Sequence, residues 1–313
     1  MTDRLTQMAC LAFTLLLPIG GRTEGILNVF PRPSSEAAGL NVSHPALAGN
    51  IFDFRTCEAV LDGNRDFGLF RVKLAPPGAP TAPAWSTNSG SCRYEWTYPE
   101  GITVRFEAVL RAESVELAYT VVNHTPAPLK QVHLHTCVTT TEAPAFFPRL
   151  ATGRESQLPP DTRDQDYTEL LTRLFVWSGG QPLRLDRTEH ARRQVHLSLL
   201  PKGGPPIEWA WWINSTNTFD EPLVAAASHD GQWTAGLWFE RAAWASANTG
   251  DDRACFHLFP LFGRIERGAS ATLRGAFWLL RGGPEELRQR VRRLPEQHSP
   301  KPLRIRPPTQ GSP

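Results

Sequence analysis

Three histidines and two cysteines occur on two short segments whose spacing can place them on one face of a β-sheet. The first segment, His133–Cys137, reads His-Leu-His-Thr-Cys, and the second carries Cys255 and His257. Side chains alternate between the two faces of a strand, so these five side chains are predicted to point away from the apolar residues between them. Imidazole exchanges protons near neutral pH, and imidazole and thiolate both bind transition metals.

Three interpretations of this polar face are open. In the leading one the face binds and processes a carbohydrate, with His135 and His257 as catalytic groups and His133 in contact with substrate. In the second, the protein binds zinc or copper through these histidines or the cysteines, but His-x-His is common in strands, so no metal ligand and no cofactor is assigned. In the third, the face is structural, with half-exposed polar residues or a Cys137–Cys255 disulfide in a non-enzymatic module.

Four more residues complete the predicted site. Glu142 follows the first histidine segment and is the nearest carboxylate in the sequence that could pair with His135 as a catalytic partner. Arg149 begins a polar, proline-bearing stretch that is typical of a loop, where binding residues often lie. Arg105 and Trp212 each lie opposite to apolar neighbours on predicted strands, and sugar rings stack on exposed indoles. These three are predicted to bind substrate.

Short strands dominate the predicted secondary structure. Apolar and polar residues alternate over 102–110, 115–121 and 130–139, and these three strands are expected to form an antiparallel meander. One helix is predicted near Gly283–Arg293, because Pro284 is followed by two glutamates and then by arginines. The fold class is therefore all-β, a large antiparallel β-sandwich with one C-terminal helix. Further strands are expected over 170–177, 194–200, 208–213, 234–240, 254–260 and 271–280.

The composition supports a large core and no polyanion partner. The chain has 313 residues, of which 41% are hydrophobic, and 33 Lys and Arg nearly balance 31 Asp and Glu. No nucleic acid and no anionic membrane is expected as a partner.

Residues 26–294 are predicted to be a single β-sandwich domain and 295–313 a disordered proline-rich tail. No phosphate loop, dinucleotide fingerprint or nucleophile elbow is present.

The N-terminus is typical of a secretory signal. Arg4 supplies a positive start, Met8–Ile19 is apolar, and this stretch is too short to span a bilayer. Residues 1–25 are therefore predicted to be a signal peptide, and the protein to be exported to the periplasm or the extracellular space. Three disulfide pairings are possible among the cysteines of the exported chain, which are Cys57, Cys92, Cys137 and Cys255.

Two stretches resemble the aldose and hexose-phosphate mutarotases. Tyr119–Leu129, followed by Leu-His-Thr-Cys-Val at 134–138, is similar to a "Y-x-V-x-N" strand, a turn and a strand with "L-H-T-Y-F". Pro260–Ser270 looks like the family's late "P-x-x-x-L-x-P-G-E" turn. The resemblance implies a galactose-mutarotase-like supersandwich and a sugar-contacting role for His135. It departs from the family where a general-base glutamate is expected, because this chain has Cys255-Phe256-His257 there.

Overall fold

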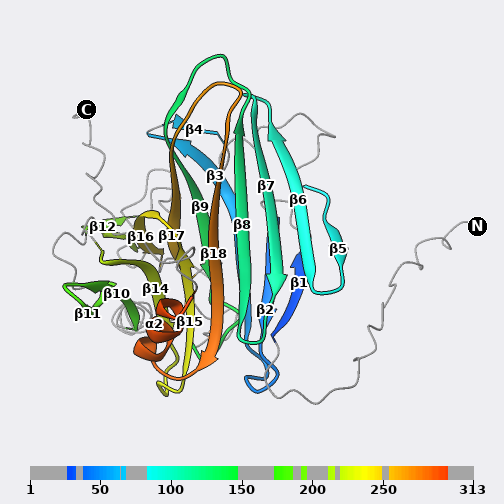
Figure 1. Ribbon diagram of the computed structural model, residues 1–313. Coiled ribbons are helices and arrows are strands. Elements are labelled where there is room, and N and C mark those ends of the chain that lie inside the picture. The colour runs from blue at the N-terminus through cyan, green and yellow to red at the C-terminus, as the bar shows by residue number, and fades with distance from the viewer. Residues whose placement is uncertain are drawn as a thin grey trace, which may run out of the picture.

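The computed structural model describes residues 27–32, 38–63, 65–67, 83–146, 173–185, 192–195, 211–215, 219–248 and 254–294. Within these ranges the chain forms two nine-stranded sheets, here called sheet A and sheet B, and the helix α2 (Pro284–Arg292). All the strand pairs are antiparallel. The predicted all-β sandwich is confirmed, with long strands running side by side (Figure 1).

Sheet A has the strand order β1-β2-β3-β9-β17-β16-β13-β12, with β4 paired to β3. Its four central strands, β3, β9, β17 and β16, position the residues discussed below. Its members are β1 (Asn28–Arg32), β2 (Ala38–Ser43), β3 (Ile51–Asp62), β4 (Arg65–Asp66), β9 (Leu129–Thr139), β12 (Arg192–Val195), β13 (Trp211–Ser215), β16 (Ala242–Asn248) and β17 (Cys255–Ile265).

Sheet B has the strand order β11-β10-β14-β15-β18-β8-β7-β6-β5. Its members are β5 (Ser86–Asn88), β6 (Ser91–Tyr98), β7 (Ile102–Leu110), β8 (Ser114–Asn123), β10 (Leu174–Ser178), β11 (Gln181–Arg184), β14 (Glu221–Ala227), β15 (Trp233–Phe239) and β18 (Ser270–Arg281).

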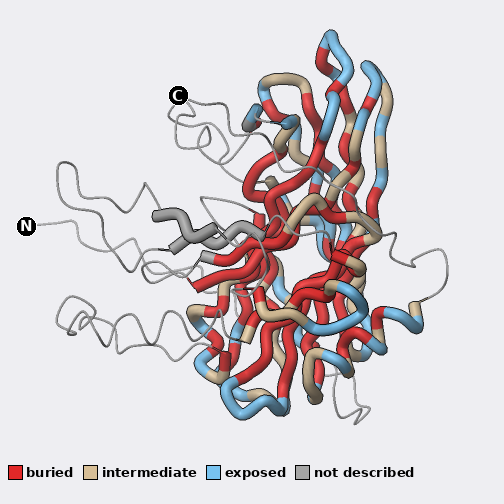
Figure 2. The backbone as a smooth tube through the Cα atoms, turned by 90° about the vertical axis from the view of Figure 1, so that its left-hand side faces the viewer, coloured by how far each residue is buried: buried red, intermediate tan, exposed pale blue. Residues whose placement is uncertain are grey.

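The hydrophobic core lies between the two sheets. Phe54 of sheet A stacks with Phe277 of sheet B, with ring centroids 6.0 Å apart, and both side chains are fully buried. Buried residues run through the middle of the strands, whereas exposed residues gather at the turns (Figure 2). Val132, Leu134 and Val138 of β9 belong to this core, as their alternation predicted.

A second, smaller hydrophobic cluster lies on the outer face of sheet B, beneath α2. Leu287 and Val291 of the helix pack there with Trp177, Trp238 and other apolar residues of β10, β14, β15 and β18. Glu285 and Glu286 lie in the first turn of α2 and Arg290 and Arg292 in the last, which complements the helix dipole. The predicted C-terminal helix is therefore confirmed.

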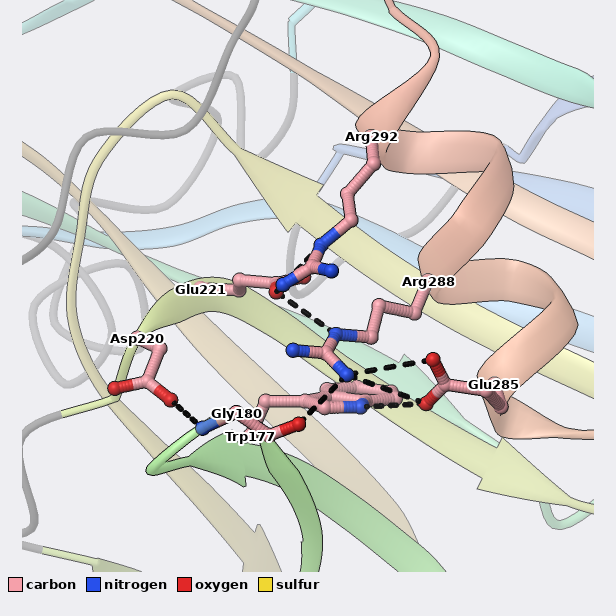
Figure 3. A network of polar contacts seen from close by, with 7 residues as sticks. All are labelled: Trp177, Gly180, Asp220, Glu221, Glu285, Arg288 and Arg292. Carbon is pink, nitrogen blue, oxygen red and sulfur yellow. Dashed lines mark hydrogen bonds and ion pairs between the residues drawn. The ribbon is translucent and has the colours of Figure 1, made fainter.

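Polar contacts also hold α2 against sheet B (Figure 3). Arg288 Nε donates to Glu221 Oε1 over 2.8 Å, and both side chains are almost fully buried. Arg288 Nη1 donates to the carbonyl oxygen of Gly180 over 2.9 Å, and Trp177 Nε1 donates to Glu285 Oε2 over 3.3 Å. We call these residues, with Arg292, the helix clasp.

The predicted meander of three strands is wrong in its last step. β7 and β8 pair as expected, but β8 then pairs with β18, whereas β9 crosses to sheet A and lies between β3 and β17. The short turn after Asn123 permits either path, so the pairing depends on long-range contacts.

β14 and β16 were not predicted, and β14 is buried at every position, so it shows no alternation of apolar and polar residues.

Several predictions concern residues outside the described ranges. These are the signal peptide at 1–25, the tail at 295–313, and the polar loop that contains Arg149. In the described part of the chain, no helix has the length and apolar character needed to cross a membrane.

Candidate functional site

The polar face predicted on the two histidine segments exists, and it is the outer face of sheet A. β9 and β17 are neighbours, with Cys255 opposite Thr139 and Phe256 opposite Val138. Phe256 and Leu258 point into the core between the sheets. His133, His135, Cys137, Cys255 and His257 therefore share the opposite face, and all five are buried.

An irregularity in β3 adds a carboxylate to this face. Arg55 pairs with Cys137 of β9, and Ala59 pairs with His135. Between these two pairs the chain continues from residue 55 to 59 in β3 but only from 137 to 135 in β9, so β3 contains extra residues. The extra residues form a bulge, which redirects the side chains of the bulged strand. As a result the Glu58 carboxylate reaches His135, with 3.6 Å between Glu58 Oε2 and His135 Nε2.

Arginines hold the carboxylates of β3 in place. Arg55 Nη1 donates to Glu58 Oε1 over 2.8 Å, and Arg55 Nε lies 3.4 Å from Asp53 Oδ2. Arg32 of β1 also pairs with Asp53. Burial opposes the charge of Arg55, but Glu58 and the other negative neighbours outweigh it and raise the pKa of the guanidinium, so Arg55 stays cationic.

Gly39 of β2 lies between Arg32 and Asp53. A Cβ atom at this position would lie 3.1 Å from Asp53 Oδ1. The glycine therefore lets the two charged side chains meet across the intervening strand.

His257 is the centre of the cluster and contacts side chains on both neighbouring strands and on its own strand. Its ring centroid lies 4.8 Å from that of His135 on β9. His257 Nδ1 lies 3.1 Å from Ser246 Oγ on β16, and His257 Nε2 lies 3.4 Å from Cys255 Sγ on its own strand. The arrangement brings two imidazoles, two thiols, a carboxylate and a hydroxyl together on one buried face.

Cys137 and Cys255 are close neighbours but do not form the disulfide considered above. None of the four cysteines in the described ranges, which also include Cys57 and Cys92, forms a disulfide. A hydrogen bond with Cys255, together with burial, raises the pKa of the Cys137 thiol well above its usual value. The Cys137 thiol is therefore protonated at physiological pH.

Aromatic rings border the cluster on one side. Phe259 stacks on His135 with ring centroids 4.8 Å apart and planes inclined by 14°, and Trp244 packs on Phe259 at 4.5 Å. His133 meets Trp244 edge-on at 4.7 Å. Burial lowers the pKa of His133 to about 4, so its imidazole is neutral at physiological pH.

Glu142 and Arg105, two of the other predicted site residues, do not belong to this cluster. Glu142 is exposed in the turn after β9, and the carboxylate next to His135 is Glu58 instead. Arg105 lies on β7 of sheet B, where its exposed guanidinium pairs with Glu95 over 2.5 Å. Trp212 lies on β13 of sheet A, paired through its backbone with Asn248 of β16. Arg149 is outside the described residues.

Sequence reasoning missed Glu58, Arg55 and Ser246. Glu58 follows Cys57 in a segment whose alternation is broken by the bulge, so no period-two pattern assigns its side chain to a face. Ser246 lies on a strand rich in alanine and opposite His257. Only the pairing of β16 with β17 connects it to the histidines.

By sequence, no known protein family and no curated protein matches this chain. Solved structures do match it at low similarity. A protein from Synechocystis sp. PCC 6803 matches with 10% identity and a TM-score of 0.40, over 80% of this chain and 95% of that one. A polysaccharide lyase matches with 10% identity and a TM-score of 0.41, over 87% of this chain and 35% of the lyase.

A third solved structure carries the family name that the sequence motifs suggested. It is a galactose mutarotase related enzyme from Lactobacillus acidophilus, which matches with 10% identity and a TM-score of 0.37 over 82% of this chain and 99% of the enzyme. Such likenesses concern the fold alone and assign no residue a role. The likeness of this chain to these structures is therefore one of low similarity, and the fold class follows from its own two antiparallel sheets.

Proposed function

We propose that the outer face of sheet A binds a carbohydrate and transfers a proton on it. The observation that carries the proposal is the contact of Glu58 with His135, 3.6 Å from carboxylate to imidazole, on a face where Arg55 holds the same carboxylate. Epimerisation and lyase-type cleavage of a sugar both need one group that accepts a proton and one that donates it. Glu58 would accept and His135 would donate.

The surroundings of this pair suit a sugar. Imidazole, carboxylate and guanidinium groups form hydrogen bonds with hydroxyls. Trp244, which is only partly buried, offers aromatic surface beside the histidines and packs on the buried Phe259. The short motif shared with mutarotases also implies a sugar contact for His135, and Glu58 supplies a carboxylate that this chain lacks on β17.

The test is a binding and turnover screen of the full chain against a glycan array and free sugars. Glu58→Gln keeps the shape of the side chain and removes its charge, and His135→Gln removes the proton donor. We expect turnover to fall by about 100-fold or more in either variant. Circular dichroism would verify that both variants fold.

The matched control is Glu95→Gln, which removes a carboxylate from an arginine pair on sheet B. This variant should bind and convert the sugar as the parent does. Equal activity in Glu58→Gln, His135→Gln and the parent would contradict the proposal. If those two variants lose stability without any change in sugar binding, the cluster is structural and the protein is a non-enzymatic module.

Export is a second part of the proposal. It is supported by the positive start and apolar stretch within residues 1–25. N-terminal sequencing of the mature protein after fractionation of the host cells tests it. Cleavage between about residues 20 and 25, with the protein outside the cytoplasm, is the expected result. An intact N-terminus in the cytoplasmic fraction would exclude it.

A further inference from the structure

Among the described residues, two groups of three side chains are arranged so that they could hold a metal ion, and both contain His257. One consists of Cys137, Cys255 and His257, and the other of Glu58, His135 and His257. Within each group the ligand atoms lie within 4.8 Å of one another, and all the members are buried. We propose that Cys137, Cys255 and His257 bind one zinc-class divalent metal ion.

The spacing of two ligand atoms in the first group fits a tetrahedral centre. Zinc binds sulfur at about 2.3 Å and imidazole nitrogen at about 2.0–2.1 Å, which places the two ligand atoms about 3.6 Å apart at a tetrahedral angle. Cys255 Sγ and His257 Nε2 are 3.4 Å apart. The bound ion therefore needs only a small adjustment of these side chains.

The second ring nitrogen of His257 already has the neighbour that a metal-bound histidine requires. Nδ1 lies 3.1 Å from Ser246 Oγ, its cross-strand partner on β16. With a metal ion on Nε2, Nδ1 carries the hydrogen and donates to the serine hydroxyl. Such outer partners orient the imidazole and typically raise metal affinity 10- to 100-fold.

One positive charge lies beside the thiols, on the same face as the negative charge of Glu58. Arg55 is the cross-strand partner of Cys137 and brings a positive charge to this part of the sheet. Two thiolates and one imidazole leave a tetrahedral ion one further position, as in catalytic zinc sites. Glu58 and His135 lie in the second group around the same His257, so either of them or a water molecule can complete the coordination.

The inference goes beyond the proposed sugar chemistry, and it is tested separately. The cysteines take no part in the Glu58–His135 pair. Stoichiometric metal with no sugar turnover would support this inference alone, and turnover by the metal-free protein would support the sugar proposal alone.

The test uses the full chain, produced without a polyhistidine tag, kept reduced, stripped with a chelator and titrated with Co²⁺ and Zn²⁺. We expect one ion per chain and the thiolate-to-cobalt charge-transfer absorption of a tetrahedral site. Cys137→Ser and Cys255→Ser should each remove this absorption. Ser246→Ala should lower the Zn²⁺ affinity about 10- to 100-fold while keeping the absorption.

Cys92→Ser is the matched control, because Cys92 is a buried free cysteine on β6 of sheet B. Its metal content should equal that of the parent. If a variant at Cys137 or Cys255 fails to fold, alkylation of the parent protein provides the test. Bound Zn²⁺ should protect these two thiols from alkylation, as measured by peptide mapping. No absorption and no protection in the reduced protein, or absorption that persists in both serine variants, would overturn the inference.

Discussion

The outer faces of the two sheets both bury charged side chains, but they do so with different chemistry. On sheet B, the helix clasp joins Arg288 and Glu221 beneath α2, over an apolar cluster (Figure 3). On sheet A, Glu58 and Arg55 lie among histidines and thiols, and α2 packs against β14 and β15 of the other sheet.

The difference lies in what the groups can exchange. In the clasp the Glu221 carboxylate is held by Arg288 and Arg292, which stay charged and bind no metal, so the contact serves to attach the helix. Imidazole, thiol and carboxylate exchange protons and bind metal ions, and on sheet A they share a single residue, His257. The clasp is therefore a stability element, and the outer face of sheet A is the candidate for chemistry.

The largest expected effect is on the clasp. Glu221→Ala leaves Arg288 buried without its main counter-charge, and such breaks cost roughly 3–5 kcal/mol of unfolding free energy. Urea unfolding of the variant and the parent measures this loss. Glu95→Ala removes a carboxylate from an exposed pair and should cost less than about 1 kcal/mol. A similar cost in both variants would mean that the clasp does not hold α2.

The next effect concerns pH and the outer face of sheet A. His133 has a pKa of about 4 in the folded protein, while the ordinary value is 6.5, so its unfolded form takes up a proton first as the pH falls. Above pH 6.5 His133 is neutral in both the folded and the unfolded protein, so it causes no loss of unfolding free energy. Between pH 6.5 and 4 the unfolded state is increasingly favoured, by up to about 3 kcal/mol, and below pH 4 the loss levels off.

His133→Leu isolates this contribution. Subtracting its unfolding free energy from that of the parent at each pH removes the other titrating groups. The difference should change between pH 6.5 and 4 and be constant on either side. A difference that does not vary with pH would show that His133 is not held neutral by burial.

The smallest expected effect comes from an apolar replacement of the clasp. Glu221→Leu combined with Arg288→Met keeps the volume and removes the buried charges together, and such exchanges are often neutral or stabilising. We expect the unfolding free energy to stay within about 1 kcal/mol of the parent or to rise, with sugar and metal binding unchanged. Loss of sugar binding or of metal binding in this variant would show that the clasp contributes to function as well as to stability.

Much of the fold was predictable from local patterns. β7, β8, β9 and β17 were predicted from the alternation of apolar and polar residues, β18 was expected as a further strand, and α2 was predicted from its proline, acids and bases. The face of the histidines was predicted correctly for the same reason. β14 was missed because core contacts on one face and the α2 cluster on the other make both of its faces apolar.

The candidate site was only half predictable. His135 and His257 were identified by their types and by the face they share, and their rings lie 4.8 Å apart. Glu142 was chosen as the partner of His135 because it is near in sequence, whereas Glu58 is near in space. The sequence also left the state of Cys137 and Cys255 open, and the structure places them as free thiols beside His257.

For the strands that alternate, the sequence by itself determined which side chains face the core and which face outward, because this alternation is a property of the local backbone. Only the tertiary structure decided which strands are neighbours. β9 lies between β3 and β17, strands far apart in the chain, because long-range burial and not the turn after Asn123 selects its partners. The bulge in β3 depends on that same pairing, and with it the meeting of Glu58 and His135.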